Sequence, residues 1–398
     1  MENKRTPDIR FAGFTDAWEQ RKYGEVIDLL SGQDFSPSEY NDTCNGIPYM
    51  TGASCIVGKE TIVNRWTTVP RCLAEKGDVL LVCKGSGYGA IAVMAQDKAH
   101  IARQFMALKN LPNLDKVFNF YLLNSVIENI KKDARGLIAG IARDAVIKQE
   151  ISIPLLAEQS QIGSLLKTLD DIIALHQRKL DKLKETKKGF LQKMFPKEGE
   201  SVPEVRFPGF FGEWEQRKLS DIKDVRDGTH DSPKYYNEGF PLVTSKNLTE
   251  NGLDMTDVSL ISEEDFQSIN KRSKVDIGDI IFGMIGTIGN PIIVDREGFA
   301  IKNVALIKNG GEVTNEFLIQ LLKSQIFGKY IQNENAGNTQ KFLGLSKIRN
   351  YQFLSPSYQE QIKIGNFFKQ LDDTIALHQR ELDALKETKK AFLQKMFV

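Results

Sequence analysis

The chain has 398 residues, of which 41% are hydrophobic and 26% are charged, a composition typical of globular proteins. Its 53 basic and 52 acidic residues leave a net charge of +1, which argues against a free-standing, non-specific nucleic-acid binder. At this length two or more domains are expected, because a single core rarely serves so long a chain.

The start of the chain, MENKRTPDIR, lacks the apolar core of a signal peptide, and no apolar run reaches the roughly 18 residues that span a bilayer. We therefore expect a cytoplasmic protein. The four cysteines have no CxxC spacing and no nearby histidine cluster, so buried thiols are expected rather than a metal site. They are Cys44, Cys55, Cys72 and Cys83.

A tandem repeat organises the whole sequence. The segment PDIRFAGFTDAWEQRKYGEV from Pro7 is echoed by PEVRFPGFFGEWEQRKLSDI from Pro203. The stretch LDDIIALHQRKLDKLKETKKGFLQKMF from Leu169 returns from Leu371 with changes at only four of 27 positions. A Pro-x-x-x-Glu-Gln motif precedes each copy, in IPLLAEQ and SPSYQEQ. The sequence thus predicts two pseudo-symmetric halves.

Each half is predicted to contain a variable globular body followed by a long repeated helix. The predicted ranges are 1–156 for body 1, 157–200 for the first helix, 201–358 for body 2 and 359–398 for the second helix. Short β-rich runs such as VLLVC and DIIFGMI precede one apolar-faced helix in each body, which indicates an α+β fold. Thr314 is the expected N-cap of the helix in body 2.

Polar, glycine-punctuated loops in the bodies carry donors and acceptors able to meet base edges and phosphates. The main stretches are SGQDFSPSEYNDTCNGIPYMTGAS from Ser31 and DGTHDSPKYYNEGFPLVTSKNLTENG from Asp227. An ordinary polar surface loop is the alternative interpretation. The candidate contacts in body 1 are Ser31, Gln33, Tyr49, Thr51, Ser54, Lys84, Ser86, Tyr88, Arg135 and Arg143. Those in body 2 are Thr229, His230, Lys234, Tyr235, Thr244, Ser245, Lys246, Asn247, Thr287, Asn338, Gln340 and Lys341.

The repeated helices show apolar residues at a spacing of 3.5, which predicts a coiled coil between them. The seam positions are Leu166, Leu169, Ile173, His176, Leu180, Leu183, Phe190 and Met194, then Phe368, Leu371, Ile375, His378, Leu382, Leu385, Phe392 and Met396. An ordinary surface helix is the alternative. Paired antiparallel, 29 residues would separate the bodies by about 43 Å, more than one turn of DNA.

Two further features of the helices bear on partners. The seam histidines are expected to be hydrogen-bonded within the helix pair rather than bound to a metal, because no further ligands are suitably spaced. Ile172, Leu175 and Leu191 widen the apolar stripe beyond one partner helix, which favours docking of a second protein.

Motifs for catalysis are weak in this sequence. KGSGYGA from Lys84 lacks the GxxxxGK[ST] spacing and is better explained as a glycine-rich turn. Only a lone Asn290-Pro291 stands where a DNA methyltransferase would carry Asn-Pro-Pro or Asp-Pro-Pro, and no nucleophile–base set is evident. We therefore expect no catalytic centre.

Together, the twin helices, the repeated RFxGFxxxWEQRK segments, the paired Pro-x-x-x-Glu-Gln motifs and the DGTHDSPK loop resemble the specificity subunit of type I restriction–modification enzymes. The resemblance covers nearly the whole chain. It implies two target recognition domains that read the halves of a split, asymmetric double-stranded DNA site, joined by an antiparallel helix pair. It also implies docking of two methyltransferase subunits and of motor–nuclease subunits. These partners would carry S-adenosylmethionine, ATP and magnesium, while this chain would carry no cofactor.

Two rival hypotheses remain from the sequence alone. One is a coiled-coil adaptor whose bodies bind proteins. The other is a catalytic DNA-modifying enzyme, which the missing motifs disfavour.

Overall fold

The computed structural model describes residues 6–85, 87–132, 140–250, 252–335 and 342–398. These residues form two compact units, Met1–His176 with Glu381–Val398 and Gln177–Arg380, which we call unit 1 and unit 2 and describe separately. Each unit contains one predicted body together with a part of both repeated helices, a division that the predicted domain ranges did not include.

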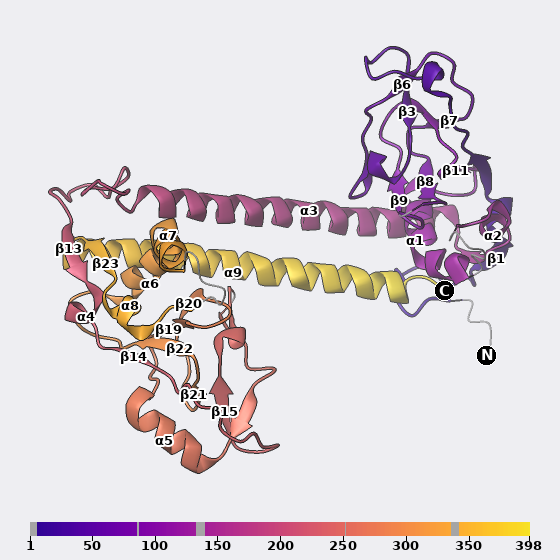
Figure 1. Ribbon diagram of the computed structural model, residues 1–398. Coiled ribbons are helices and arrows are strands. Elements are labelled where there is room, and N and C mark those ends of the chain that lie inside the picture. Colours follow the sequence, from indigo (N-terminus) through magenta and orange to yellow (C-terminus); the bar gives the residue numbers. More distant parts are fainter. Residues whose placement is uncertain (1–5, 86, 133–139, 251, 336–341) are drawn as a thin grey trace. The chain divides into compact units, whose positions relative to one another are not determined.

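The two repeated segments form long helices, α3 (Leu156–Lys193) and α9 (Tyr358–Lys395), each of 38 residues (Figure 1). Each begins shortly after the proline of the Pro-x-x-x-Glu-Gln motif, has a glutamate in its first turn and ends with lysine. Negative charge near the N-terminus and positive charge near the C-terminus both favour a helix through its dipole. The most similar segments of the two repeats are therefore the ones that form these two helices.

The seam residues predicted for α3 and α9 are all buried or half-buried, while most charged positions between them are exposed. In unit 1, Leu166 of α3 and Met396, the residue after α9, share one core, and Asp170 of α3 pairs with Lys389 of α9 at 2.6 Å. In unit 2, Lys187 of α3 pairs with Asp372 of α9 at 2.5 Å. Rising numbers on one helix meet falling numbers on the other, so the predicted antiparallel pairing is confirmed within each unit.

The main elements of body 1 are two four-stranded sheets and the helix α1, which confirms the α+β prediction. The first sheet has the order β2-β11-β8-β9 and is antiparallel throughout; the second has the order β6-β3-β10-β7 and contains a parallel β3–β10 pair. Helix α1 packs on the first sheet and carries Phe118 and Leu122 into its core. The bounds are β2 Ile27–Ser31, β3 Ile47–Met50, β6 Trp66–Thr67, β7 Leu73–Glu75, β8 Val79–Val82, β9 Ile91–Val93, β10 Lys98–Ile101, β11 Phe105–Asn110 and α1 Lys116–Lys132.

Body 2 repeats this plan with different sequences. Its antiparallel sheet has the order β14-β22-β19-β20, and its second sheet, β18-β15-β21, again contains a parallel pair, β15–β21. The bounds are β14 Val225–Asp227, β15 Phe240–Val243, β18 Ser259–Ile261, β19 Ile280–Gly283, β20 Gly289–Ile293, β21 Ala300–Ile301, β22 Val304–Ile307, α5 Glu263–Ser273, α6 Asn315–Lys323 and α7 Gln325–Glu334.

The apolar-faced segment near the end of body 2 differs from the single helix that the sequence predicted. Thr314 caps it as expected, its hydroxyl accepting a hydrogen bond from the Phe317 amide at 3.3 Å. At Ser324 the backbone becomes extended, with φ −73° and ψ 162°, and divides the segment into α6 and α7. Apolar periodicity continues across Ser324, so the break was not visible in the pattern.

Short elements complete the two bodies. Body 1 contains β1 Glu19–Lys22, η1 Tyr23–Glu25, η2 Pro37–Glu39, η3 Ala53–Cys55, β4 Ile56–Val57, β5 Glu60–Thr61, α2 Arg143–Ile147 and β12 Glu150–Ile153. Body 2 contains β13 Glu215–Lys218, α4 Leu219–Ile222, η4 Ser245–Asn247, β16 Leu248–Thr249, β17 Gly252–Leu253, α8 Leu345–Arg349 and β23 Gln352–Ser355.

The repeated leading segments close each unit in the same way. The sequence EQRK forms β1 in unit 1 and β13 in unit 2, and these pair antiparallel with β12 and β23, the strands that lead into α3 and α9. Arg10 and Arg206, from the RFxGF segments, then reach the glutamates of the Pro-x-x-x-Glu-Gln motifs. Both pairs are bidentate, with N–O distances of 2.7 and 2.8 Å to Glu158 and Glu360.

The glutamine of each motif ties the start of a long helix to its body. Gln159 accepts a hydrogen bond from the Asp115 amide at 2.9 Å, just before α1. Gln361 accepts from the Thr314 amide at 3.0 Å, at the cap of α6. Both glutamines also donate to the carbonyl of the motif proline. The repeated motif is therefore a structural joint rather than a ligand site.

Aromatic residues at the end of each helix complete the cores. In unit 1, Phe397 lies 5.4 Å from Phe118 and 6.4 Å from Trp18, measured between ring centroids. In unit 2, Phe195 lies 5.5 Å from Phe317 and 6.1 Å from Trp214. The residues that follow α9, from the second repeat, thus complete the core of unit 1. The residues that follow α3, from the first repeat, complete the core of unit 2.

Within the described parts of the chain, no helix combines the length and the apolar character needed to cross a bilayer.

Candidate nucleic-acid interface

The first polar loop of each body leaves its sheet through a glycine that allows close backbone contact. The amide of Gly32 donates to the Phe105 carbonyl, and that of Gly228 donates to the Val304 carbonyl. A Cβ at Gly32 would stand 2.1 Å from a carbonyl oxygen, and one at Gly228 would stand 2.2 Å from one. Any larger residue would push the loop away from the neighbouring strand, so the glycine holds both loops in the same path.

In each body a second polar segment lies beside this first polar loop. The parallel strand pairs, β3–β10 in body 1 and β15–β21 in body 2, bring the two together. In body 1 the Ala102 amide donates to the Met50 carbonyl, and β3 continues into η3. In body 2 the Lys302 amide donates to the Val243 carbonyl, and β15 continues into η4. The loops after β2 and β14 meet the same strands, since Gln33 and Thr229 donate to the carbonyls of Ile101 and Ile301.

In body 1 these segments line an open hollow of about 500 Å³. Its walls combine hydrogen-bonding groups, aromatic rings and a cation: Asp34, Phe35, Tyr40, Tyr49, Thr51, Gly52, Ala53, Ser54, Arg65 and Gln104. The Phe35 and Tyr49 rings meet edge to face at 5.0 Å, and the Arg65 guanidinium lies 4.7 Å from the Tyr40 ring centroid. This mixture suits contacts with base edges and phosphates.

A buried histidine supports the floor of this hollow. His100 Nδ1 accepts hydrogen bonds from the amides of Arg71 and Cys72, at 3.2 and 3.1 Å, so Nε2 carries the proton and donates to the Gln33 carbonyl at 2.6 Å. Burial lowers the pKa of His100, which keeps the ring neutral. His100 thereby fixes the backbone of a predicted contact residue, and sequence reasoning did not identify it.

The corresponding place in body 2 holds a polar network instead of an aromatic hollow. His230 contacts Asp227 through Nε2 at 3.0 Å and Asn303 through Nδ1 at 2.9 Å. Arg272 pairs with the same Asp227 at 3.1 Å, and Lys302 donates to the Ser232 hydroxyl at 2.6 Å. The side chains of His230 and Arg272 are 47% and 63% exposed, so the network is available to a ligand.

The predicted contacts of body 1 fall into three groups. Ser31, Gln33, Thr51 and Ser54 are exposed or half-buried at or beside the hollow, whereas Tyr49 is buried in its wall. Lys84 is exposed and Tyr88 half-buried on the β8–β9 connection, where Lys131 covers the Tyr88 ring at 5.8 Å. Arg143 donates to the Leu29 carbonyl on β2. Ser86 and Arg135 lie outside the described residues.

In body 2, Thr229 is half-buried and His230, Lys234, Tyr235 and Lys246 are exposed around the network, and Thr287 is exposed on the β19–β20 turn. Ser245 and Asn247 are buried; the Asn247 amide binds the Asp254 and Asp257 carbonyls, and its oxygen accepts from the Thr244 hydroxyl at 3.0 Å. For Thr244, Ser245 and Asn247 the geometry favours a role in supporting the loop, and their direct contact with DNA stays a prediction. Asn338, Gln340 and Lys341 lie outside the described residues.

Sequence reasoning missed several residues at these sites: Arg65 and Gln104 in body 1, and Arg272, Lys302 and Asn303 in body 2. All of them are distant in sequence from the loops they join. Asn303, with φ +56°, stands directly before β22 in the short connection from β21, where a non-glycine residue in the left-handed region signals a constrained turn. The parallel strand pairs bring Gln104, Lys302 and Asn303 to the loops. Arg65 precedes β6, which pairs antiparallel with β3, and Arg272 lies on α5. No local pattern in the sequence indicates these contacts.

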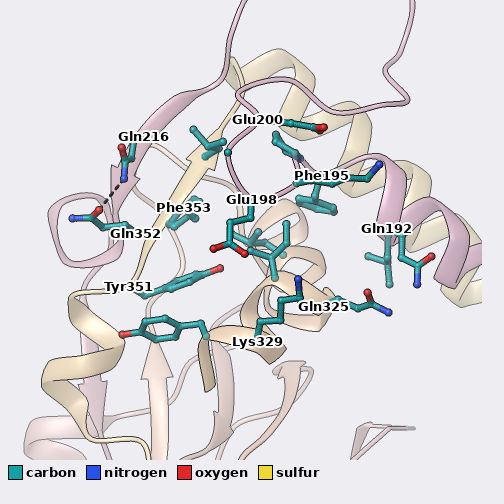
Figure 2. A pocket seen from close by; sticks show the side chains of 18 of the residues that line it. Gln192, Phe195, Glu198, Glu200, Gln216, Gln325, Lys329, Tyr351, Gln352 and Phe353 are labelled. Atoms are coloured by element: carbon teal, nitrogen blue, oxygen red, sulfur yellow. Dashed lines mark hydrogen bonds between the residues drawn. The ribbon is translucent and has the colours of Figure 1, made fainter. Parts of the chain in front are cut away.

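Unit 2 also contains a hollow of about 700 Å³ between residues 195–200, α7 and β23 (Figure 2). Tyr351, Phe353, Lys329 and Glu198 are among the residues that line it. Gln216 donates a hydrogen bond to Gln352 at 2.8 Å. None of the predicted or observed loop residues above lines it. We therefore do not assign it to the nucleic-acid interface.

The helices carry the remaining predicted surface. Leu175 is 57% exposed in unit 1, and its counterpart Leu377 is 48% exposed in unit 2, while Ile172 is half-buried. Leu191 packs against the core of unit 2, which removes it from the proposed docking stripe.

Comparison with known proteins identifies both halves of the chain. The family model described as "Type I restriction modification DNA specificity domain" matches residues 15–185 and again residues 212–387. The type I restriction enzyme MjaVIII specificity subunit of Methanocaldococcus jannaschii is 23% identical over 401 residues, covering 94% of this chain and 91% of the relative.

Solved structures share the fold. The S subunit of a type I restriction–modification system from M. genitalium matches with a TM-score of 0.68 and 18% identity, over 99% of both chains. A chain from a type I system studied for complex assembly and conformational transition matches with a TM-score of 0.53 and 15% identity, over 95% of this chain and 97% of that one.

Proposed function

The chain belongs to the family of type I restriction–modification DNA specificity domains, and we propose that its two bodies read the two unlike halves of an asymmetric, split DNA target. One observation carries this proposal. The same backbone hydrogen bonds hold the polar loops of both bodies, yet the loops present different side chains. Two readers with one architecture and different contact groups fit a site with two different half-sequences.

The chemistry of the groups suggests how each body meets DNA. In body 1, Gln104 and Arg65 can form the paired hydrogen bonds that amides make with adenine and guanidinium groups make with guanine. In body 2, His230 and Asn303 offer donors and acceptors to base edges, while Lys302 and Arg272 suit phosphates. Lys234, Tyr235 and Lys246 extend the second surface.

The balanced charge of the chain supports a role for partners in binding. Phosphate neutralisation provides much of the affinity of proteins for DNA, and a net charge of +1 supplies little of it. We propose that two methyltransferase subunits dock along α3 and α9, with Leu175 and Leu377 among the contacts, and that motor–nuclease subunits join them for restriction. In this arrangement S-adenosylmethionine, ATP and magnesium belong to the partners, and the chain itself is non-catalytic and acts in the cytoplasm.

A methylation map tests the proposal. DNA would be taken from cells that express this chain with its methyltransferase, and from cells in which residues 220–350 are replaced by those of a related subunit. We expect a split motif in which the half read by body 2 changes and the half read by body 1 stays. A motif indifferent to the exchange would instead support a protein-binding adaptor, and methyl transfer by the purified chain alone would support a catalytic role.

A further inference from the structure

Three groups meet at one carboxylate in unit 1. Asp170 of α3 accepts a hydrogen bond from the Tyr121 hydroxyl of α1 at 2.5 Å and from Lys389 of α9 at 2.6 Å. It also pairs with Lys59, whose ammonium lies 5.9 Å from the Phe120 ring centroid. Only 14% of the Asp170 side chain is exposed, so these contacts replace most of its hydration.

Lys59 is the member of this cluster that comes from a different part of the body. Tyr121, Asp170 and Lys389 stand on helices that share the core beneath the first sheet. Lys59 stands on the turn between β4 and β5, which belongs to the part of body 1 that carries the hollow. The pair between Lys59 and Asp170 therefore connects the recognition part of body 1 to the helix seam.

A short series of hydrogen bonds connects the Lys59 turn with the wall of the hollow. The Lys59 carbonyl accepts from the Val93 amide at 3.2 Å, and the Ile62 amide donates to the Cys55 carbonyl at 2.8 Å. Cys55 ends η3, and its sulfur accepts from the Thr51 amide at 3.4 Å. Ala53 and Ser54 of this segment line the hollow itself. The Lys59 turn is therefore joined through the β4–β5 strand pair and Cys55 to the segment that lines the hollow.

We propose that Lys59 is a positioning residue for the first half-site, which holds the hollow of body 1 in a fixed direction relative to α3 and α9 through its pair with Asp170. This inference rests on the proposed function. The seam ion pair itself has a counterpart in unit 2, Lys187 with Asp372. In unit 2 Glu250, which follows β16, interacts electrostatically with Lys323 of α6, and Lys323 also interacts with Lys187 and Asp372. The second half-site therefore has charged groups of its own near the helix seam, and a change at Lys59 should leave it unaffected.

The charges around Lys59 make the link sensitive to alkaline pH. The charged groups that face it are Asp170 from α3 and Lys389 from α9, and Tyr121 from α1 donates a hydrogen bond to Asp170. Burial, together with the second ammonium of Lys389, lowers the pKa of Lys59 to about 8. Burial opposes the charge of Asp170, yet hydrogen bonds from Lys389, Lys59 and Tyr121 bring its pKa below the ordinary value. Raising the pH through 8 removes the proton from Lys59 and weakens its pair with Asp170.

The test compares three variants in the complex of the full chain with its methyltransferase. Lys59→Met removes the charge and keeps most of the length, Lys59→Arg keeps a charge at every accessible pH, and Lys76→Met is the control, because Lys76 pairs with Asp97 on an exposed turn of the same body. Labelled methyl transfer is measured on duplexes that match the motif, or carry one mismatch in either half. The ratio of matched to mismatched transfer gives the discrimination at each half-site.

For Lys59→Met we expect about a tenfold loss of discrimination at the first half-site and no change at the second, a loss that corresponds to about 1.4 kcal/mol. The wild type should lose discrimination at the first half-site between pH 7 and pH 9, whereas Lys59→Arg should keep it.

Equal behaviour of Lys59→Met and Lys76→Met, an equal loss at both half-sites, or a wild-type profile that matches Lys59→Arg would each overturn the positioning role. A wild-type complex without any split motif would overturn the proposed function itself, and the positioning role with it.

Discussion

The side chains of body 1 and body 2 differ most on the loops that equivalent backbone hydrogen bonds hold in both bodies. Gly32 and Gly228 hold equivalent loops against equivalent strands, and the segments after β3 and β15 lie beside them in both bodies. Body 1 surrounds this place with Phe35, Tyr40 and Tyr49, while body 2 fills it with charged and polar groups around His230. The frame thus sets where contact groups stand, and the loop sequences are free to change which groups they are.

The largest effect should come from the frame. Replacing Arg10 by methionine leaves Glu158, whose side chain is 1% exposed, as a buried charge without its bidentate partner. We expect a loss of about 3–5 kcal/mol in unit 1, and the same loss in unit 2 for Arg206→Met, which leaves Glu360 unpaired. Urea unfolding followed by hydrogen exchange would locate each loss.

Two controls sharpen this comparison. Arg296→Met removes an exposed pair and should change stability by less than about 1 kcal/mol. The double replacement of Arg10 and Glu158 by methionine should recover much of the loss, since no charge then stays buried. An Arg10→Met variant as stable as Arg296→Met would contradict the structural role of the joint.

Replacing the phenylalanine that follows each long helix should destabilise the two units by different amounts. Phe195 is 1% exposed and packs among Trp214, Phe317 and Phe368, so Phe195→Ala should cost about 3 kcal/mol in unit 2. Phe397 is half-buried, so Phe397→Ala should cost about 2 kcal/mol in unit 1. Thermal unfolding of both variants measures the difference, and a larger loss for Phe397→Ala would reverse the ranking.

The last expected difference is a pH dependence of the stability of body 1 that comes from His100. His100 pairs with Tyr49 across the β3–β10 strands, and the corresponding residue of body 2 is Ala300. Because burial lowers the pKa of His100 in the folded state, the unfolded chain binds more protons below about pH 6.5. Stability of body 1 should therefore fall as the pH drops from 7 to 5, by at most about 1.4 kcal/mol per pH unit.

Hydrogen exchange of β10 and β21 at both pH values checks this expectation. Protection should fall in β10 and stay constant in β21. His100→Gln provides the control, because it removes the titrating group and should abolish the dependence. Equal acid sensitivity of both strands would show that His100 is not its cause.

The sequence predicted those parts of the fold that are recorded in local patterns. Apolar spacing identified α3 and α9, and their near-identity identified the pseudo-symmetric frame. The Arg10–Glu158 pair joins two repeated motifs that the sequence marked without explaining. The break at Ser324 was missed because apolar periodicity continues through it.

The contact sites depended on long-range strand pairing and were predicted only in part. Polarity and glycine spacing singled out Gln33, Thr51 and His230 as DNA contacts. The structure places them at or beside the open, polar sites, and their contact with DNA stays a prediction. Gln104, Asn303 and Lys59 reach these sites, or their support, through β10, β21 and the β4–β5 turn. Nothing in their immediate sequence distinguishes them from other polar residues.

The closing of unit 1 by the end of α9 has a consequence for biosynthesis. The Ile9 amide donates to the Lys395 carbonyl at 3.0 Å, and Trp18 contacts Phe397, so the core of body 1 is incomplete until α9 has been synthesised. The corresponding contacts in unit 2, between Val205 and Lys193 and between Trp214 and Phe195, join neighbouring parts of the chain. Because contacts between distant residues form slowly, body 2 should mature first although it is translated second. A chain that ended at Arg380 would contain all of unit 2 but would lack the part of α9 that belongs to unit 1.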